Sequence, residues 1–99
     1  MKKFILVFAV LGVNAAFAET ANGHIETAAR MNVAENLCDI NFGQTRGVVF
    51  HVLLGASQLN ISKETAALLA DARHAEIVRY LNRVGKLDEF CQNARAGKL

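Results

Sequence analysis

Two cysteines and three histidines are the residues of this 99-residue chain whose side chains could carry redox, metal or haem chemistry. Cys38 and Cys91 are 53 positions apart, so they do not form the CxxC pair of a redox-active dithiol, and no CxxCH motif for covalent haem occurs. Their spacing relative to the histidines matches no known zinc site. We therefore expect a structural disulfide between Cys38 and Cys91 and no bound metal.

His51 is the histidine with the most informative surroundings. It belongs to a narrow polar strip in an otherwise apolar segment, made of Gly47, His51, Gly55 and Gln58. A glycine inside a helix costs about 1 kcal/mol relative to alanine, and close approach of another backbone or a ligand is the usual reason for it. One interpretation is that His51 contacts a ligand or haem iron in a groove lined by glycines. The other, which we favour, is that His51 faces solvent or bonds to a neighbouring helix.

Arg73 falls by helical phase inside the apolar face of its segment. A buried guanidinium without a partner is very costly, so we expect an ion pair with Asp39 or Glu35, or a side chain that extends to water. The alternative is that Arg73 recognises an anion or an acidic side chain of a partner. The candidate binding surface therefore consists of the polar strip and this arginine: Gly47, His51, Gly55, Gln58 and Arg73.

No signature of an enzyme is found in the sequence. The chain has neither a GxSxG motif nor a glycine-rich phosphate loop, and carboxylate pairs such as Asp71 and Glu76 are expected to face solvent. Met31 lies on an apolar stripe, where a methionine more often fills a core than binds haem. We expect no catalytic residues, no cofactor and no enzymatic activity.

Residues 1–18 have the pattern of an export signal. Lys2 and Lys3 precede an apolar run, and residues 16–18 read Ala-Phe-Ala, a small-x-small cleavage site. Cleavage would leave one domain, residues 19–99, in the periplasm or secreted, where cysteines form disulfides. A retained N-terminal anchor is the alternative, although the apolar run is short for a membrane span.

The charge of the expected mature chain excludes some partners. Without the two leader lysines, nine basic residues balance nine acidic ones. A neutral domain gives no reason to expect nucleic acid or an anionic membrane as partner. No later apolar run approaches the roughly 20 residues needed for a membrane span.

The mature chain is predicted to be all-α, a small four-helix domain tied by one disulfide, with three longer helices and a short C-terminal one. It has no proline and much alanine, and its apolar residues recur at helical spacing. We expect helices over about 23–42, 45–59 and 63–84, then a short helix capped by Asp88 and ended by Gly97. Ser62 and Gly85 are the expected caps of the third helix.

Apolar residues surround most of the segment 45–59, which predicts that it is the buried, central helix. The short connections predict antiparallel neighbours.

This general plan resembles two groups of small exported bacterial helical proteins with one disulfide. They are the acid-stress periplasmic chaperones of the HdeA type and the periplasmic immunity proteins against secreted peptidoglycan-degrading toxins. The resemblance covers size, leader, helical content and two distant cysteines, and it includes no diagnostic motif. The chaperones carry a long lysine-rich tail after their second cysteine, whereas eight residues follow Cys91.

These observations predict a non-catalytic exported protein that acts by protein–protein binding, such as an inhibitor or immunity-type protein. Its partner would be another exported protein or a second copy of itself in a homodimer. The alternatives are an acid-stress chaperone and a small-ligand or haem-binding protein that uses His51.

Overall fold

The computed structural model describes residues 22–43 and 47–99, and all regular secondary structure in this part of the chain is helical. It contains four helices and no strand: α2 (Gly23–Leu37), α3 (Val48–Leu59), α4 (Lys63–Val84) and α5 (Leu87–Arg95). The prediction of an all-α domain with three longer helices and one short helix is confirmed. The expected export signal lies outside the described residues. No helix within the described ranges combines the length and apolarity that a membrane crossing requires.

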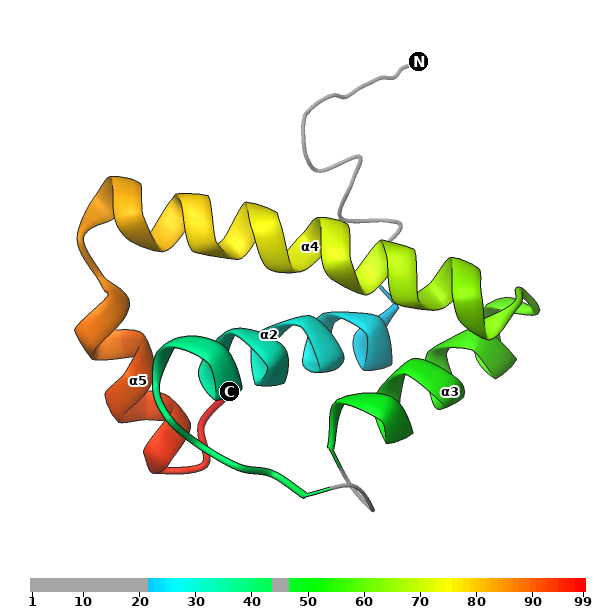
Figure 1. The fold of residues 1–99 in the computed structure, drawn as a ribbon, viewed down its shortest axis with the longest axis horizontal. Helices are drawn as coiled ribbons and strands as arrows, with labels where there is room; N and C mark the ends of the chain where they lie inside the picture. The colour runs from blue at the N-terminus through cyan, green and yellow to red at the C-terminus, as the bar shows by residue number, and fades with distance from the viewer. Residues whose placement is uncertain (1–21, 44–46) are drawn as a thin grey trace.

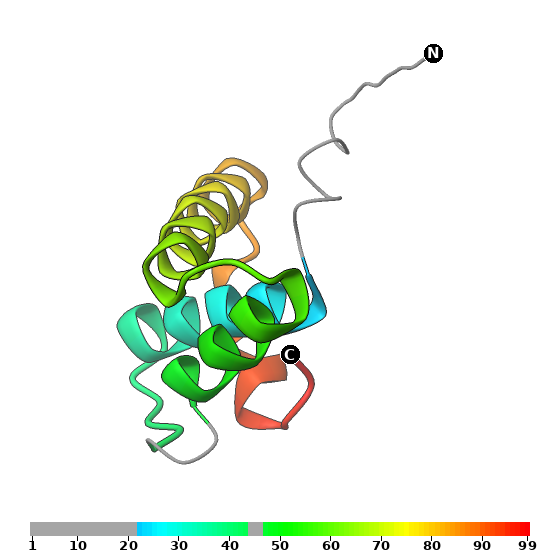
Figure 2. The same cartoon turned by 90° about the vertical axis from the view of Figure 1, so that its right-hand side faces the viewer.

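Figure 1 shows α4 lying along α2, with α3 and α5 at opposite ends of α2. Viewed from the side in Figure 2, α2 lies between α4 and α5. Both α2 and α4 pack against the other three helices. A larger fraction of the residues of α2 is buried than of α4.

Local capping residues explain where most helices begin and end. The Asn22 side chain accepts hydrogen bonds from the backbone N–H groups of His24 and Ile25 at the start of α2. The Ser62 hydroxyl accepts one from Thr65 N–H at 3.0 Å, and Gly85 ends α4 with a left-handed backbone at φ 69°. Both caps of α4 were predicted from the sequence.

Three predicted boundaries were wrong or untested. The first helix ends at Leu37, not Phe42, because Asp39 takes a left-handed conformation (φ 58°) that stops the helix. The last helix begins with Lys86 as its N-cap, and Asp88 lies in its first turn, where the helix dipole favours an acid. α3 begins at Val48, and its expected start at Thr45 lies outside the described residues.

The prediction that the segment 45–59 is the central, buried helix was also wrong. Within α3 only Gly55 and Ala56 are buried, whereas Val49 is 64% exposed and Leu53 is 49% exposed. The central helix is α2, and half of its buried residues are alanines: Ile25, Ala28, Ala29, Met31, Val33 and Ala34. Alanines bury little surface each, but they allow neighbouring helices to approach α2 from several sides.

The core consists of three clusters arranged along α2. Near its start, residues of α2, α3 and α4 meet: Ile25, Ala28, Ala56, Ala66 and Ala70. In its middle, residues of α2 and α4 meet: Ala29, Val33, Ile77 and Leu81. At its end, Ala34 and Cys38 meet Cys91 and Ala94 of α5. Ile40 and Phe42 pack against this last cluster from the non-helical segment that follows α2.

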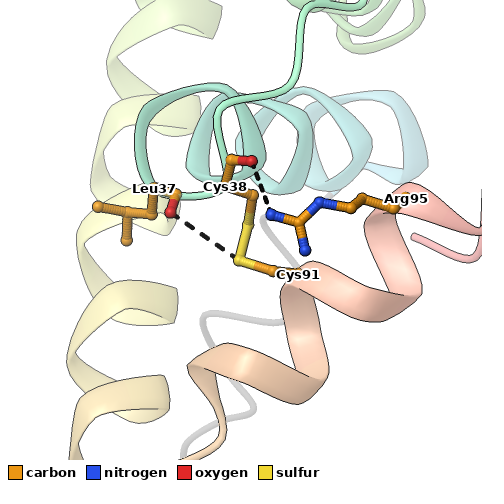
Figure 3. Close-up of a disulfide and its surroundings, with 4 residues drawn as sticks. All are labelled: Leu37, Cys38, Cys91 and Arg95. Carbon is orange, nitrogen blue, oxygen red and sulfur yellow. Dashed lines mark hydrogen bonds between the residues drawn. A yellow bond between two sulfur atoms is a disulfide. The ribbon is translucent and has the colours of Figure 1, made fainter.

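The expected disulfide between Cys38 and Cys91 is present and ties α5 to the end of α2 (Figure 3). Both cysteines are buried. Arg95 donates a hydrogen bond from Nη2 to the carbonyl oxygen of Cys38 at 3.1 Å, and the Leu37 carbonyl oxygen lies 3.9 Å from the Cys91 sulfur. Leu87 and Phe90 of α5 are partly buried against the core, and only Cys91 and Ala94 are buried, so the covalent bond adds to a small apolar contact.

We predict that the double variant Cys38→Ser, Cys91→Ser loses about 4 kcal/mol of unfolding free energy, because the bond closes a loop of 53 residues in the unfolded chain. Urea unfolding of the oxidised wild type and the variant measures this difference. The amide signals of α5 should lose their dispersion first. A variant within about 1 kcal/mol of the wild type would contradict this account of α5.

Candidate functional site

Gly55 lies where α2 approaches α3 closely. A Cβ atom added at Gly55 would lie 2.7 Å from Cδ1 and 2.8 Å from Cγ1 of Ile25, and 3.3 Å from Oδ1 of Asn22. Ile25 is only 1% exposed, so its side chain has little room to move away. The sequence indicated a close approach at this glycine, and the structure shows that the approaching side chain comes from the same chain.

His51 lies beside His24 of α2. Their Nδ1 atoms are 3.0 Å apart, and the two rings stack with centroids 5.2 Å apart at an angle of 24°. A hydrogen bond at this distance requires one Nδ1 to carry a proton and the other to accept it, so it needs at least one neutral ring. Burial, and in addition the positive charge of His24, lower the pKa of His51. This pair therefore favours the neutral form of His51.

The two ends of the polar strip also contact residues of this chain. Gln58 accepts a hydrogen bond through Oε1 from Nδ2 of Asn22 at 2.7 Å. Gly47 is the N-cap residue of α3 and is buried, and a Cβ atom there would meet the carbonyl oxygen of Gly43. The strip therefore faces the start of α2 and the chain before α3.

Arg73 binds Glu26 on α2 rather than the expected Asp39 or Glu35. Its Nε and Nη2 donate to the two Glu26 carboxylate oxygens at 2.6 and 3.1 Å, and Nη1 donates to Glu76 at 3.2 Å. The two helices run in the same direction, with the start of α4 packed beside α3, which brings Arg73 level with the first turns of α2 (Figure 1).

The ion pair shifts the pKa values of both partners. Burial raises the pKa of Glu26, but hydrogen bonds and charges from Arg73 and Arg30 outweigh it, so this pKa lies below its usual value. The hydrogen bonds that Arg73 donates to Glu26 are the main cause that raises the pKa of Arg73. The Glu26 carboxylate therefore stabilises the fold when ionised, and that contribution is lost in strong acid.

Four of the five candidate binding residues thus contact residues 22–26 at the start of α2. Gln58 reaches Asn22, His51 reaches His24, Gly55 reaches Ile25 and Arg73 reaches Glu26. Sequence reasoning did not identify His24 or Glu26 as their partners, because which turn of one helix lies beside another depends on register and not on composition. Within the described residues, no group of three or more metal-binding side chains is present.

A hollow between α3 and α4 was also not foreseen. It has a volume of about 360 Å³, and its lining is mainly apolar: Val48, Val49, Val52, Leu53, Ala67 and Ala70. Polar residues also line it: Asn32, Lys63, Glu64 and Asp71. We call it the α3–α4 groove. The sequence did carry a signal for it, since α3 has more large apolar residues than one buried face can use.

No protein-family model, curated protein or solved structure matches this chain.

We predict that Gly55→Leu lowers the free energy of unfolding by about 1–3 kcal/mol, because the added side chain collides with Ile25 in a packed core. Gly23→Ala is the matched control, since a Cβ there would meet no atom within 4 Å, and its effect should stay within about 0.5 kcal/mol. Urea unfolding measures both variants. If Gly55→Leu were as stable as the wild type, the contact between α2 and α3 would be looser than described.

We also predict that acid weakens the start of α2. Because the pKa of His51 is lowered in the folded protein, the unfolded chain binds more protons at this residue. Above about pH 6.5, His51 should contribute fully to the free energy of unfolding. This contribution should disappear as the pH falls below about 6.5 and through the lowered pKa that His51 has in the folded protein. Urea unfolding at a series of pH values measures this, and His51→Gln should show a smaller decrease. An unchanged decrease in that variant would assign the effect to other groups.

Proposed function

We propose that this protein is an exported, non-catalytic domain that binds another exported protein through the α3–α4 groove. Export is supported by the leader pattern at residues 1–18 and by the buried disulfide, a bond that persists outside the reducing cytosol. The observation that carries the binding proposal is the apolar surface of α3, which the rest of the described chain leaves uncovered.

The exposed residues of α3 occur together rather than singly. Val49 and Leu53 are one helical turn apart, and both line the groove while remaining about half exposed or more. Isolated exposed apolar side chains are ordinary, but grouped ones on a small domain mark a contact surface. The groove lining is mainly apolar, and it also contains the charged residues Lys63, Glu64 and Asp71. Protein interfaces commonly have such an apolar centre and a polar rim.

The shape of the groove favours a different protein over a second copy as its occupant. A two-fold symmetric dimer places the same surface of each copy against the other, so it would set one hollow against another. An apolar helix or loop of another protein can instead fill the groove.

Function as an acid-stress chaperone is a second candidate, favoured by a specific observation. Two contacts that lose strength on protonation, His24 with His51 and Arg73 with Glu26, lie within one turn of each other at the start of α2. Acid would loosen both contacts and expose the apolar residues beneath them. Light scattering of a client protein at low pH, with and without this domain, tests this candidate. Undiminished client aggregation would remove it.

We predict that Leu53→Glu abolishes binding to the partner, because it places a charge in the apolar groove. The measurement is affinity capture from a periplasmic extract of the native bacterium, followed by titration of the captured protein. Leu68→Glu is the matched control, because Leu68 is an exposed leucine (67%, against 49% for Leu53) that does not line the groove. Equal capture by both variants would overturn the assignment of the groove, and sedimentation of the purified protein as a dimer would identify self-association instead.

A further inference from the structure

A second hollow lies between the C-terminal half of α4, the middle of α2 and the start of α5. Its volume is about 510 Å³, and the residues that matter for its chemistry are Arg30, Arg79, Arg83, Tyr80 and Phe90. We call it the arginine pocket. Its described lining residues belong to α2, α4 and α5, and none of them belongs to α3.

The pocket carries an excess of positive charge. Four arginines line it, and Glu76 is the single acidic residue among its described lining residues. Arg73 and Arg30 share the Glu26 carboxylate, and Arg73 also binds Glu76. Arg79 and Arg83 form no ion pair within the described residues. Two guanidinium groups are therefore available for an anion from outside the chain.

Aromatic side chains lie beside these arginines. The Arg83 guanidinium carbon is 5.6 Å from the centre of the Tyr80 ring, a cation–π contact that restrains the guanidinium over an exposed ring. Phe90 of α5 and Ile77 of α4 add apolar surface to the same hollow. The pocket thus combines apolar surface with guanidinium groups, whose N–H donors suit carboxylate or phosphate oxygens.

We propose that the arginine pocket binds an acidic segment of a partner protein, with an aromatic or aliphatic side chain on Tyr80 and Phe90 and neighbouring carboxylates on Arg79 and Arg83. This proposal rests on the proposed function and deepens it, because it names the chemistry of the partner. Tyrosine and arginine are among the residue types most enriched at the hot spots of protein interfaces, the few residues that contribute most of the binding energy.

Charge complementarity favours a protein segment over nucleic acid as occupant. The positive charge gathers around a single hollow, and the expected mature chain is neutral as a whole. Nucleic-acid binding uses a basic stripe that follows many phosphates. An acidic segment with one apolar side chain needs only a single charged site with an apolar floor.

The test is titration of the isotope-labelled oxidised protein with three probes, followed by nuclear magnetic resonance. The first probe is the capped peptide Glu-Phe-Glu, the second is the capped peptide Gln-Phe-Gln, and the third is a short DNA duplex. We expect the acidic peptide to shift the signals of Tyr80, Arg83 and Phe90, and the neutral peptide to bind at least tenfold more weakly.

The matched variants separate the pocket from overall charge. Arg79→Gln with Arg83→Gln should weaken binding of the acidic peptide at least tenfold. Lys86→Gln with Lys98→Gln removes the same charge at residues that line neither hollow, and it should leave binding within twofold. Circular dichroism and thermal melting confirm that both double variants fold.

Equal binding of both peptides, equal loss in both double variants, or shifts with DNA alone would each overturn the pocket as a site for an acidic segment. The result is independent of the capture experiment. If Leu53→Glu abolishes capture while the pocket variants bind the partner normally, the proposed function stands without the pocket. If the pocket binds the peptide but no partner is captured through the groove, the proposed function of the groove is wrong and the pocket assignment stands.

Discussion

The packing of Ile25 against Gly55 is the constraint on which the arrangement of the first helices depends. Because position 55 lacks a side chain, the side chain of Ile25 can pack against the α3 backbone, where it is almost fully buried. That distance brings the flanking polar groups into hydrogen-bonding range, so that Asn22 meets Gln58 and His24 meets His51. A larger residue at position 55 would separate the helices and weaken all of these contacts together.

Sequence reasoning succeeded where structure depends on neighbours along the chain. Ser62 and Gly85 could be identified as caps because each acts on backbone groups a few residues away, and the disulfide followed from two cysteines in a chain with a leader pattern. Sequence reasoning failed where the structure depends on the register of two helices or on how deeply a helix is buried. The many apolar residues of α3 indicated a central helix, yet α2 holds that place with small alanines, because burial depends on how many helices lie around a segment. Likewise Arg73 needed a carboxylate, but only packing determines that it is Glu26.

Different kinds of interaction connect the two ends of α2 to the other helices. At its start, hydrogen bonds, an ion pair and close apolar packing connect it to α3 and α4, and protonation weakens two of these contacts. At its end, a covalent bond connects it to α5, and acid does not break a disulfide. Acid should therefore loosen the domain from one end while α5 stays attached. Such a partial opening is the behaviour that the second functional candidate requires, and it follows from where the titratable groups lie.

The geometry of α4 limits what kind of partner can use both hollows. Ala67 lines the α3–α4 groove and Tyr80 lines the arginine pocket, and their separation of 13 positions corresponds to about 20 Å along a helix. At about 100° per residue, the two side chains also point roughly 140° apart around the helix axis. One flat surface cannot face both. A partner that occupies the groove with an apolar helix or loop must therefore reach the pocket with an extended acidic arm that passes around α4, or the two hollows bind different proteins.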